Sequence, residues 1–136
     1  MVFLLFKLGL RIGEAVALKW SDIDWETREI NIHRMEIRME DENGKLEVVI
    51  VEYTKKKSPA DDRYLPLGDY EINLFEIVKQ TNEEAGYLDD DFIFCDEEER
   101  TKIREFDNCI RAQCTREGIE VKSAYEIRTI IPYYKY

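Results

Sequence analysis

Residues Gly9–Asp24 have the sequence GLRIGEAVALKWSDID, and this segment constrains the architecture more than any other part of the chain. Gly9 follows an apolar run, at the kind of position where a glycine commonly ends a helix. The segment Arg11–Lys19 predicts a second helix, since apolar residues share one helical face at Ile12, Ala15, Val16 and Leu18. The residues that follow, Trp20–Asp24, predict a short turn.

The chain opens on an apolar run, Met1–Leu10, of which Met1–Leu8 predicts the end of a buried helix. It is too short to cross a bilayer, because a spanning helix needs about 20 apolar residues. It also has neither the basic leader nor the small-residue cleavage site of a signal peptide. We therefore expect a cytoplasmic protein with no membrane partner.

Three β-rich segments follow the turn and predict a three-stranded antiparallel meander. Residues Glu29–Ile37 alternate apolar and polar side chains, Leu46–Tyr53 is rich in valine and isoleucine, and Arg63–Leu67 is short. The pair Asn43-Gly44 suits a tight turn with positive φ between the first two strands. A charged loop, Lys55–Asp62, separates the last two.

The remainder of the chain predicts helices. Asp69–Ala85 has a helical pattern closed by Gly86, and Thr101–Glu117 carries one apolar face, formed by Phe106, Ile110 and Cys114. Ser123 is a good N-cap for a last helix. Residues 1–136 therefore form one domain of the α+β class, a three-stranded antiparallel sheet packed with helices.

The charge of the chain is strongly acidic but unevenly distributed. The formal net charge is -10, which by itself argues against a nucleic-acid partner. Nine of the 30 acidic residues fall in Glu83–Glu99, which contains no lysine or arginine; the rest of the chain has 30 - 9 = 21 acids against 20 basic residues. A basic surface outside the acidic segment is therefore compatible with this composition.

The cysteines and the histidine do not predict a disulfide framework or a metal site. Cys95, Cys109 and Cys114 are odd in number and irregular in spacing, and the sequence has no CxxC pair. His33 is the single histidine. We expect reduced thiols and no metal.

Three motifs in order carry a family resemblance. GLRIGEAVAL with the WSDID that follows it, the sheet exit RYLPL at Arg63–Leu67, and SAYEIR at Ser123–Arg128 resemble the conserved boxes of the tyrosine recombinases of the phage-integrase type. The resemblance covers essentially the whole chain. It implies the catalytic fold of that family and DNA strand exchange without a cofactor, in which a tyrosine attacks a phosphodiester.

The resemblance also implies which residues handle the phosphate. Arg11 and Arg128 match the two arginines that hold it, and a planar guanidinium suits phosphate oxygens. Lys57 matches the lysine that protonates the leaving 5′ oxygen, with Lys55 as the alternative. Glu14 matches an acidic position suited to orienting Arg11, although an ordinary surface glutamate is nearly as compatible with the sequence.

The chain departs from the family pattern in two respects. Tyr125 occupies the position of a family histidine, and a phenol is a poor proton shuttle at neutral pH. The family's nucleophilic tyrosine lies several tens of residues beyond its second arginine, so Tyr133, Tyr134 and Tyr136 lie too close to Arg128 to match it. His33 is also misplaced for either family histidine, which favours a satisfied strand residue.

These departures predict a catalytic domain that is partial at both ends, from a fragment or a degenerate integrase gene, and unable to cleave DNA alone. DNA is the partner that the resemblance implies. The alternative is a non-catalytic interaction module derived from an integrase, which associates with itself as a homo-oligomer through exposed apolar surface.

Overall fold

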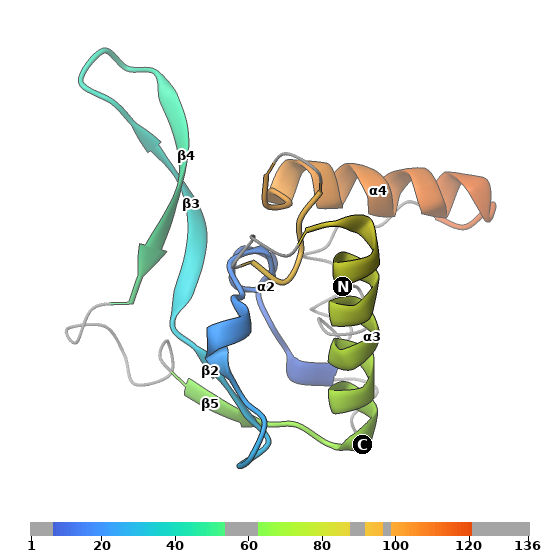
Figure 1. The fold of residues 1–136 in the computed structure, drawn as a ribbon. Helices are drawn as coiled ribbons and strands as arrows, with labels where there is room; N and C mark the ends of the chain where they lie inside the picture. The colour runs from blue at the N-terminus through green and yellow to red at the C-terminus, as the bar shows by residue number, and fades with distance from the viewer. Residues whose placement is uncertain (1–6, 54–62, 88–91, 97–98, 121–136) are drawn as a thin grey trace.

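The computed structural model describes residues 7–53, 63–87, 92–96 and 99–120, and its strands lie beside two long helices (Figure 1). The elements in chain order are α2 (Ile12–Val16), the 3-10 turn η1 (Trp20–Asp22), β1 (Ile23–Asp24), β2 (Glu29–Ile32), β3 (Arg34–Glu40), β4 (Leu46–Glu52), β5 (Arg63–Pro66), α3 (Asp69–Ala85) and α4 (Ile103–Arg116). The α+β class is confirmed.

The strand pairing differs from the predicted meander. The predicted strand Glu29–Ile37 is divided at His33 into β2 and β3, which belong to different sheets. The three-stranded sheet has the order β1-β2-β5, whereas β3 pairs only with β4 among the described strands. The meander is therefore wrong, although an antiparallel three-stranded sheet is present.

The division at His33 has a physical cause. The His33 ring is 2.8 Å from a carboxylate oxygen of Asp22, and the His33 carbonyl accepts the backbone N–H of Tyr53 at 2.8 Å. Ile32 pairs with Arg63, and Arg34 pairs with Glu52. The chain between β4 and β5 thus departs and returns beside His33, while the β3–β4 hairpin extends away from the helices (Figure 1).

Helix α2 is shorter than the predicted Arg11–Lys19. The backbone N–H of Leu18 bonds the carbonyl of Ala15 at 3.3 Å, which tightens the last turn. Lys19 then takes an extended conformation and forms an antiparallel bridge with Phe92. This bridge draws the chain out of the helix and into the start of η1.

The two long helices match their predictions closely. Helix α3 covers the predicted residues, and Gly86 ends it in the left-handed conformation, with φ 85°. Helix α4 buries the predicted face of Phe106, Ile110 and Cys114. Most of the predicted first helix and all of the predicted last helix at Ser123 lie outside the described residues.

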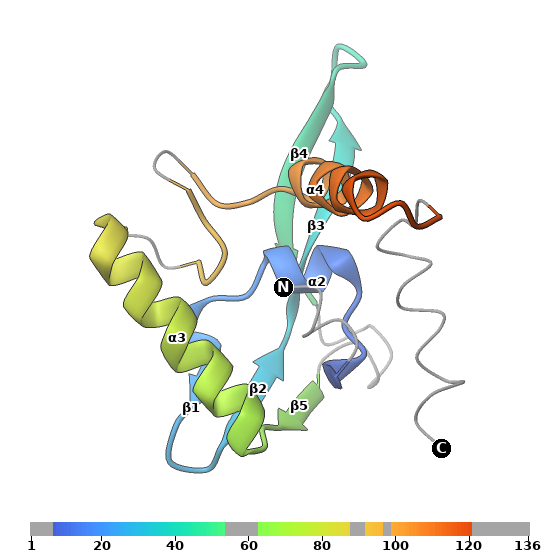
Figure 2. The same ribbon diagram turned by 90° about the vertical axis from the view of Figure 1, so that its right-hand side faces the viewer.

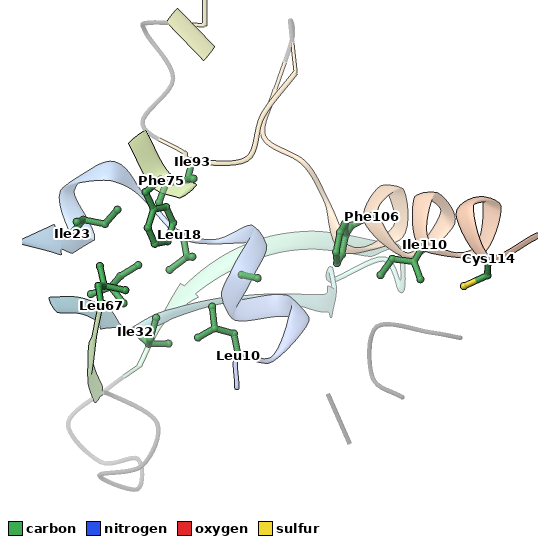
Figure 3. Packing of buried hydrophobic residues seen from close by; sticks show 12 residues of the cluster. Leu10, Leu18, Ile23, Ile32, Leu67, Phe75, Ile93, Phe106, Ile110 and Cys114 are labelled. Atoms are coloured by element: carbon green, nitrogen blue, oxygen red, sulfur yellow. The ribbon is translucent and has the colours of Figure 1, made fainter. Parts of the chain in front are cut away.

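One hydrophobic core joins the helices to the sheet. Figure 3 shows Phe75 of α3 directed toward Leu18 and Ile93, with Ile23 nearby. The buried cluster contains Leu10, Ala15, Leu18, Ile23, Ile30, Ile32, Leu67, Phe75, Ile93, Phe106, Ile110 and Cys114. The segment that follows Gly9 is therefore central to the packing, as its apolar pattern predicts.

Replacing Phe75 with alanine tests how much this core contributes to the free energy of unfolding. The side chain is 0% exposed, so Phe75→Ala should lower the free energy of unfolding by about 3–5 kcal/mol. Ile77→Ala on the same helix is the matched control, because Ile77 is 53% exposed and should change stability little. Urea denaturation followed by circular dichroism measures both, and equal losses would contradict the described packing of α3.

Candidate functional site

A buried glutamate, Glu14, connects α2 to both sides of the charged loop. Its carboxylate accepts the Arg63 guanidinium at 2.8 and 3.2 Å and the Tyr53 hydroxyl at 2.9 Å. It also accepts the backbone N–H of Arg11 at 2.9 Å. Tyr53 and Arg63 are the described residues on either side of residues 54–62. Glu14 therefore holds Tyr53 and Arg63, the described residues on the two sides of the charged loop, close to the backbone of Arg11.

The environment of Glu14 keeps it ionised. Burial by itself raises the pKa of Glu14, but the hydrogen bonds from Arg63, the Arg11 backbone and Tyr53, with the charge of Arg63, bring that pKa below its ordinary value. The residue is 1% exposed, so the surface-glutamate alternative is wrong. An ionised carboxylate in this position needs its donors, since an unpaired buried charge is strongly destabilising.

Tyr53 is held as a hydrogen-bond donor rather than as a proton shuttle. Burial and the hydrogen bond to Glu14 raise the pKa of Tyr53 to about 12, although a hydrogen bond from Arg11 acts in the opposite direction. The phenol is therefore protonated at neutral pH. It links Arg11 and Glu14 without exchanging a proton.

Arg11 lies at the start of α2 with its side chain exposed. Its backbone is extended, with φ -70° and ψ 147°, and is fixed by the bond to Glu14. The guanidinium interacts with the Tyr53 hydroxyl. The structure thus brings together Arg11, Glu14, Tyr53 and Arg63. Because the charge of Arg63 is balanced by Glu14, Arg11 supplies the positive charge that this group presents.

Two further buried carboxylates stabilise the neighbouring elements. Asp22 accepts the Arg34 guanidinium at 2.8 and 2.6 Å and contacts His33 at 2.8 Å. Glu36 accepts Arg100 at 2.6 Å and the backbone N–H of Ile103 at 3.1 Å. These pairs attach η1 to β3, and β3 to the start of α4.

The sequence interpretation missed these partners. Arg63 was identified only as part of the RYLPL exit, and Tyr53 only as the end of a strand. A signal for the buried ion pairs of Arg34 and Glu36 is present in the sequence. These two residues follow Ile30 and Ile32 at a spacing of two, which places charged side chains on the inward face of the strand. His33 has hydrogen-bonding partners, as expected, but it lies between β2 and β3 and not within a strand.

Several predicted site residues cannot be placed. Lys55, Lys57, Tyr125, Arg128 and the tyrosines Tyr133, Tyr134 and Tyr136 lie outside the described residues. Within the described part, no cluster of histidine, cysteine, aspartate and glutamate side chains could hold a metal ion. Cys95, Cys109 and Cys114 are not joined in disulfides. No helix among the described residues is both long and apolar enough to cross a membrane.

Comparison with known proteins identifies relatives over most of the chain. The model of the phage integrase family matches residues 1–131. A tyrosine recombinase XerC-like protein of Caldanaerobacter subterraneus subsp. tengcongensis is 41% identical over 58 residues, which are 40% of this chain and 15% of that protein.

Solved structures share the fold at low sequence identity. The Tn1549 transposon integrase, in complex with a circular intermediate DNA, is 18% identical with a TM-score of 0.74, over 96% of this chain and 43% of that one. The XerA recombinase is 18% identical with a TM-score of 0.64, over 94% of this chain and 39% of that one. The chain therefore spans less than half the length of these proteins.

The ionisation of Glu14 predicts a pH dependence of stability. Because the folded pKa lies below the unfolded value of about 4.3, the stabilisation is complete above that value and is lost as pH falls through the folded pKa. Glu14→Gln should remove this acid-sensitive part and lower the free energy of unfolding at pH 7 by about 3 kcal/mol. Urea denaturation at a series of pH values measures both effects.

The exposed Glu29 provides the control for this measurement. Glu29→Gln removes the same charge from the surface and should leave the pH profile unchanged. A Glu14→Gln variant with the wild-type profile would show that Glu14 does not carry the acid sensitivity.

Proposed function

This chain belongs to the phage integrase family, and on that premise we propose that it is part of a site-specific tyrosine recombinase that binds DNA and acts in the integration or excision of a mobile element. The observation that carries the proposal is the Glu14 network, which fixes Arg11 beside both flanks of the lysine-containing loop. Residues of a family motif in the sequence thus take part in a hydrogen-bonded network in the structure.

The proposed chemistry is the binding of a DNA phosphodiester by convergent positive groups. Arg11 and Arg128 contact the non-bridging oxygens, where negative charge develops during phosphoryl transfer. When a tyrosine attacks the phosphorus and the P–O bond to the 5′ oxygen breaks, as in the family reaction, Lys57, or Lys55 in its place, would protonate that oxygen. Tyr125 donates a hydrogen bond where the family has a histidine.

Glu14 is a positioning residue in this proposal. It holds the backbone of Arg11 and the two flanks of the loop, and therefore acts through other residues. The Tn1549 integrase in its DNA complex shares the fold, which supports DNA as the partner. A cytoplasmic location, where bacterial DNA is accessible, is part of the same proposal.

Strand cleavage by residues 1–136 alone is not part of the proposal. Tyr133, Tyr134 and Tyr136 follow Arg128 too closely to match the family nucleophile. We therefore propose that residues 1–136 bind a DNA phosphate without forming a covalent link to it.

Self-association is a second candidate function with its own observation. Met39, Leu46 and Val48 on the β3–β4 hairpin are 51%, 60% and 40% exposed. Apolar residues exposed beside an edge strand favour pairing with another chain. Sedimentation velocity over a range of concentrations tests it, and a monomer throughout would exclude a homo-oligomer.

Replacing Arg11 tests the proposed DNA site. Arg11→Ala should weaken binding to a duplex by about tenfold, the effect of losing one charge-assisted contact. Fluorescence anisotropy during a salt titration measures it. Arg116→Ala removes the same charge from the last turn of α4 and should have a smaller effect.

The same duplex, carrying a nick, tests for cleavage on a denaturing gel. We expect no covalent protein–DNA adduct. An adduct would contradict the assignment and direct attention to Tyr133, Tyr134 and Tyr136. Equal weakening by Arg11→Ala and Arg116→Ala would reduce the effect to overall charge and remove the support for a site at Arg11.

A further inference from the structure

A groove separates the β3–β4 hairpin from the start of α4. Its volume is about 430 Å³, and its walls include Arg38 of β3, Leu46 and Val48 of β4, and Lys102 and Arg104 at the start of α4. Figure 2 shows α4 lying beside the hairpin, with α2 next to both. The groove therefore lies near the helix that begins after Arg11, but its lining includes none of the residues of the Glu14 network.

The two arginines of this groove differ from the other arginines that the structure describes. Arg38 and Arg104 are exposed, and neither guanidinium has an ion pair or hydrogen bond with another described residue. The remaining arginines are engaged, for example Arg34 with Asp22 and Arg111 with Asp107. Two unpaired guanidinium groups thus line one concave surface in a chain whose net charge is -10.

The carboxylates that share the groove are already occupied. Glu36 is 5% exposed and accepts Arg100 and the backbone N–H of Ile103. Glu105 accepts the backbone N–H of Lys102 at 3.0 Å. These bonds hold both carboxylates to other donors, so Arg38 and Arg104 remain available to an anion from outside.

The position of the groove relates it to the Glu14 network. A Cβ atom on Gly13 of α2 would lie 3.0 Å from the carbonyl oxygen of Glu36 and 3.6 Å from the side chain of Ile103. Helix α2 therefore packs directly on the strand and helix start that form the groove. Gly13, two residues after Arg11, thus lies next to Glu36 of the groove lining.

We infer that this groove binds backbone phosphates of DNA through Arg38 and Arg104, as a second contact beyond Arg11. The inference rests on the proposed function. A guanidinium presents a planar pair of donors that matches phosphate oxygens. The acidic residues Glu40, Asp41 and Glu42 at the hairpin tip repel a duplex, which confines the contact to the part of the hairpin nearest α4.

The double variant Arg38→Ala/Arg104→Ala tests this inference in the 136-residue chain. Binding to a 30-base-pair duplex should weaken by at least about tenfold. The slope of log affinity against log salt should become shallower by about 1.8, because each phosphate contact contributes about 0.9. Fluorescence anisotropy between low and physiological salt gives both quantities, and thermal denaturation confirms that the variant remains folded.

The matched control is Lys45→Ala/Arg111→Ala, which removes two charges from the hairpin and α4 outside the groove lining. It should leave the slope nearly unchanged. An equal change in both double variants would overturn the groove as a specific contact. If Arg38→Ala/Arg104→Ala has the salt dependence of the wild type while Arg11→Ala binds DNA more weakly, the groove does not contact DNA and the proposed function still holds.

Two other outcomes would contradict the inference in different ways. A wild-type chain that does not bind the duplex at any salt concentration would overturn the proposed function and the groove together. Poly-glutamate binding that the groove variant loses, with DNA binding retained, would assign the groove to an acidic protein segment and overturn the DNA assignment.

Discussion

The described structure depends on one carboxylate that is almost completely withdrawn from water. Glu14 is 1% exposed, and desolvating such a group is unfavourable by several kcal/mol unless donors surround it. Its donors come from the N-cap of α2, from the residue after β4 and from β5, and they lie up to 49 residues from Glu14 in sequence. The helix start, the hairpin and the short strand therefore have to meet at one point. The loop between Tyr53 and Arg63 is fixed at its flanks for the same reason.

Asp22 and Glu36 form the same kind of buried ion pair at two other contacts between elements. Each is paired with an arginine from a different element, so three ion pairs connect α2, η1, β3, β5 and the start of α4. Buried pairs of this kind contribute little net stability compared with well-packed apolar residues. Their geometry is demanding, however, because each guanidinium needs its carboxylate in one orientation. We interpret them as elements that select one arrangement of the strands, while the core around Phe75 provides most of the favourable free energy.

Local patterns predicted those parts of the fold that local interactions determine. Helix α3 follows from its apolar spacing and from Gly86, since both signals lie within the helix and its cap. The division of the strand at His33 could not be predicted, because the pairing that changes there, from β5 at Ile32 to β4 at Arg34, joins residues far apart in sequence. At the site, the motif identified Arg11 and Glu14. It could not identify Arg63 as the partner of Glu14, since helical spacing describes only neighbours three or four residues apart.

The net charge of -10 is a poor guide to the charge of any one part of the surface. Glu14, Asp22 and Glu36 are buried and paired with arginines, so these six residues contribute little field at the surface. The Glu83–Glu99 segment accounts for most of the remaining excess of acid. The field that a duplex meets is set by exposed groups within about a Debye length, roughly 8 Å at physiological salt, and not by the sum over the chain. Arg11 lies at the start of α2, and Arg38 and Arg104 line the groove beside that helix. The acidic segment ends close to this groove, where Glu99 pairs with Lys102. Each buried pair removes one positive and one negative charge, so a locally positive surface on this acidic protein depends on which exposed arginines stay unpaired.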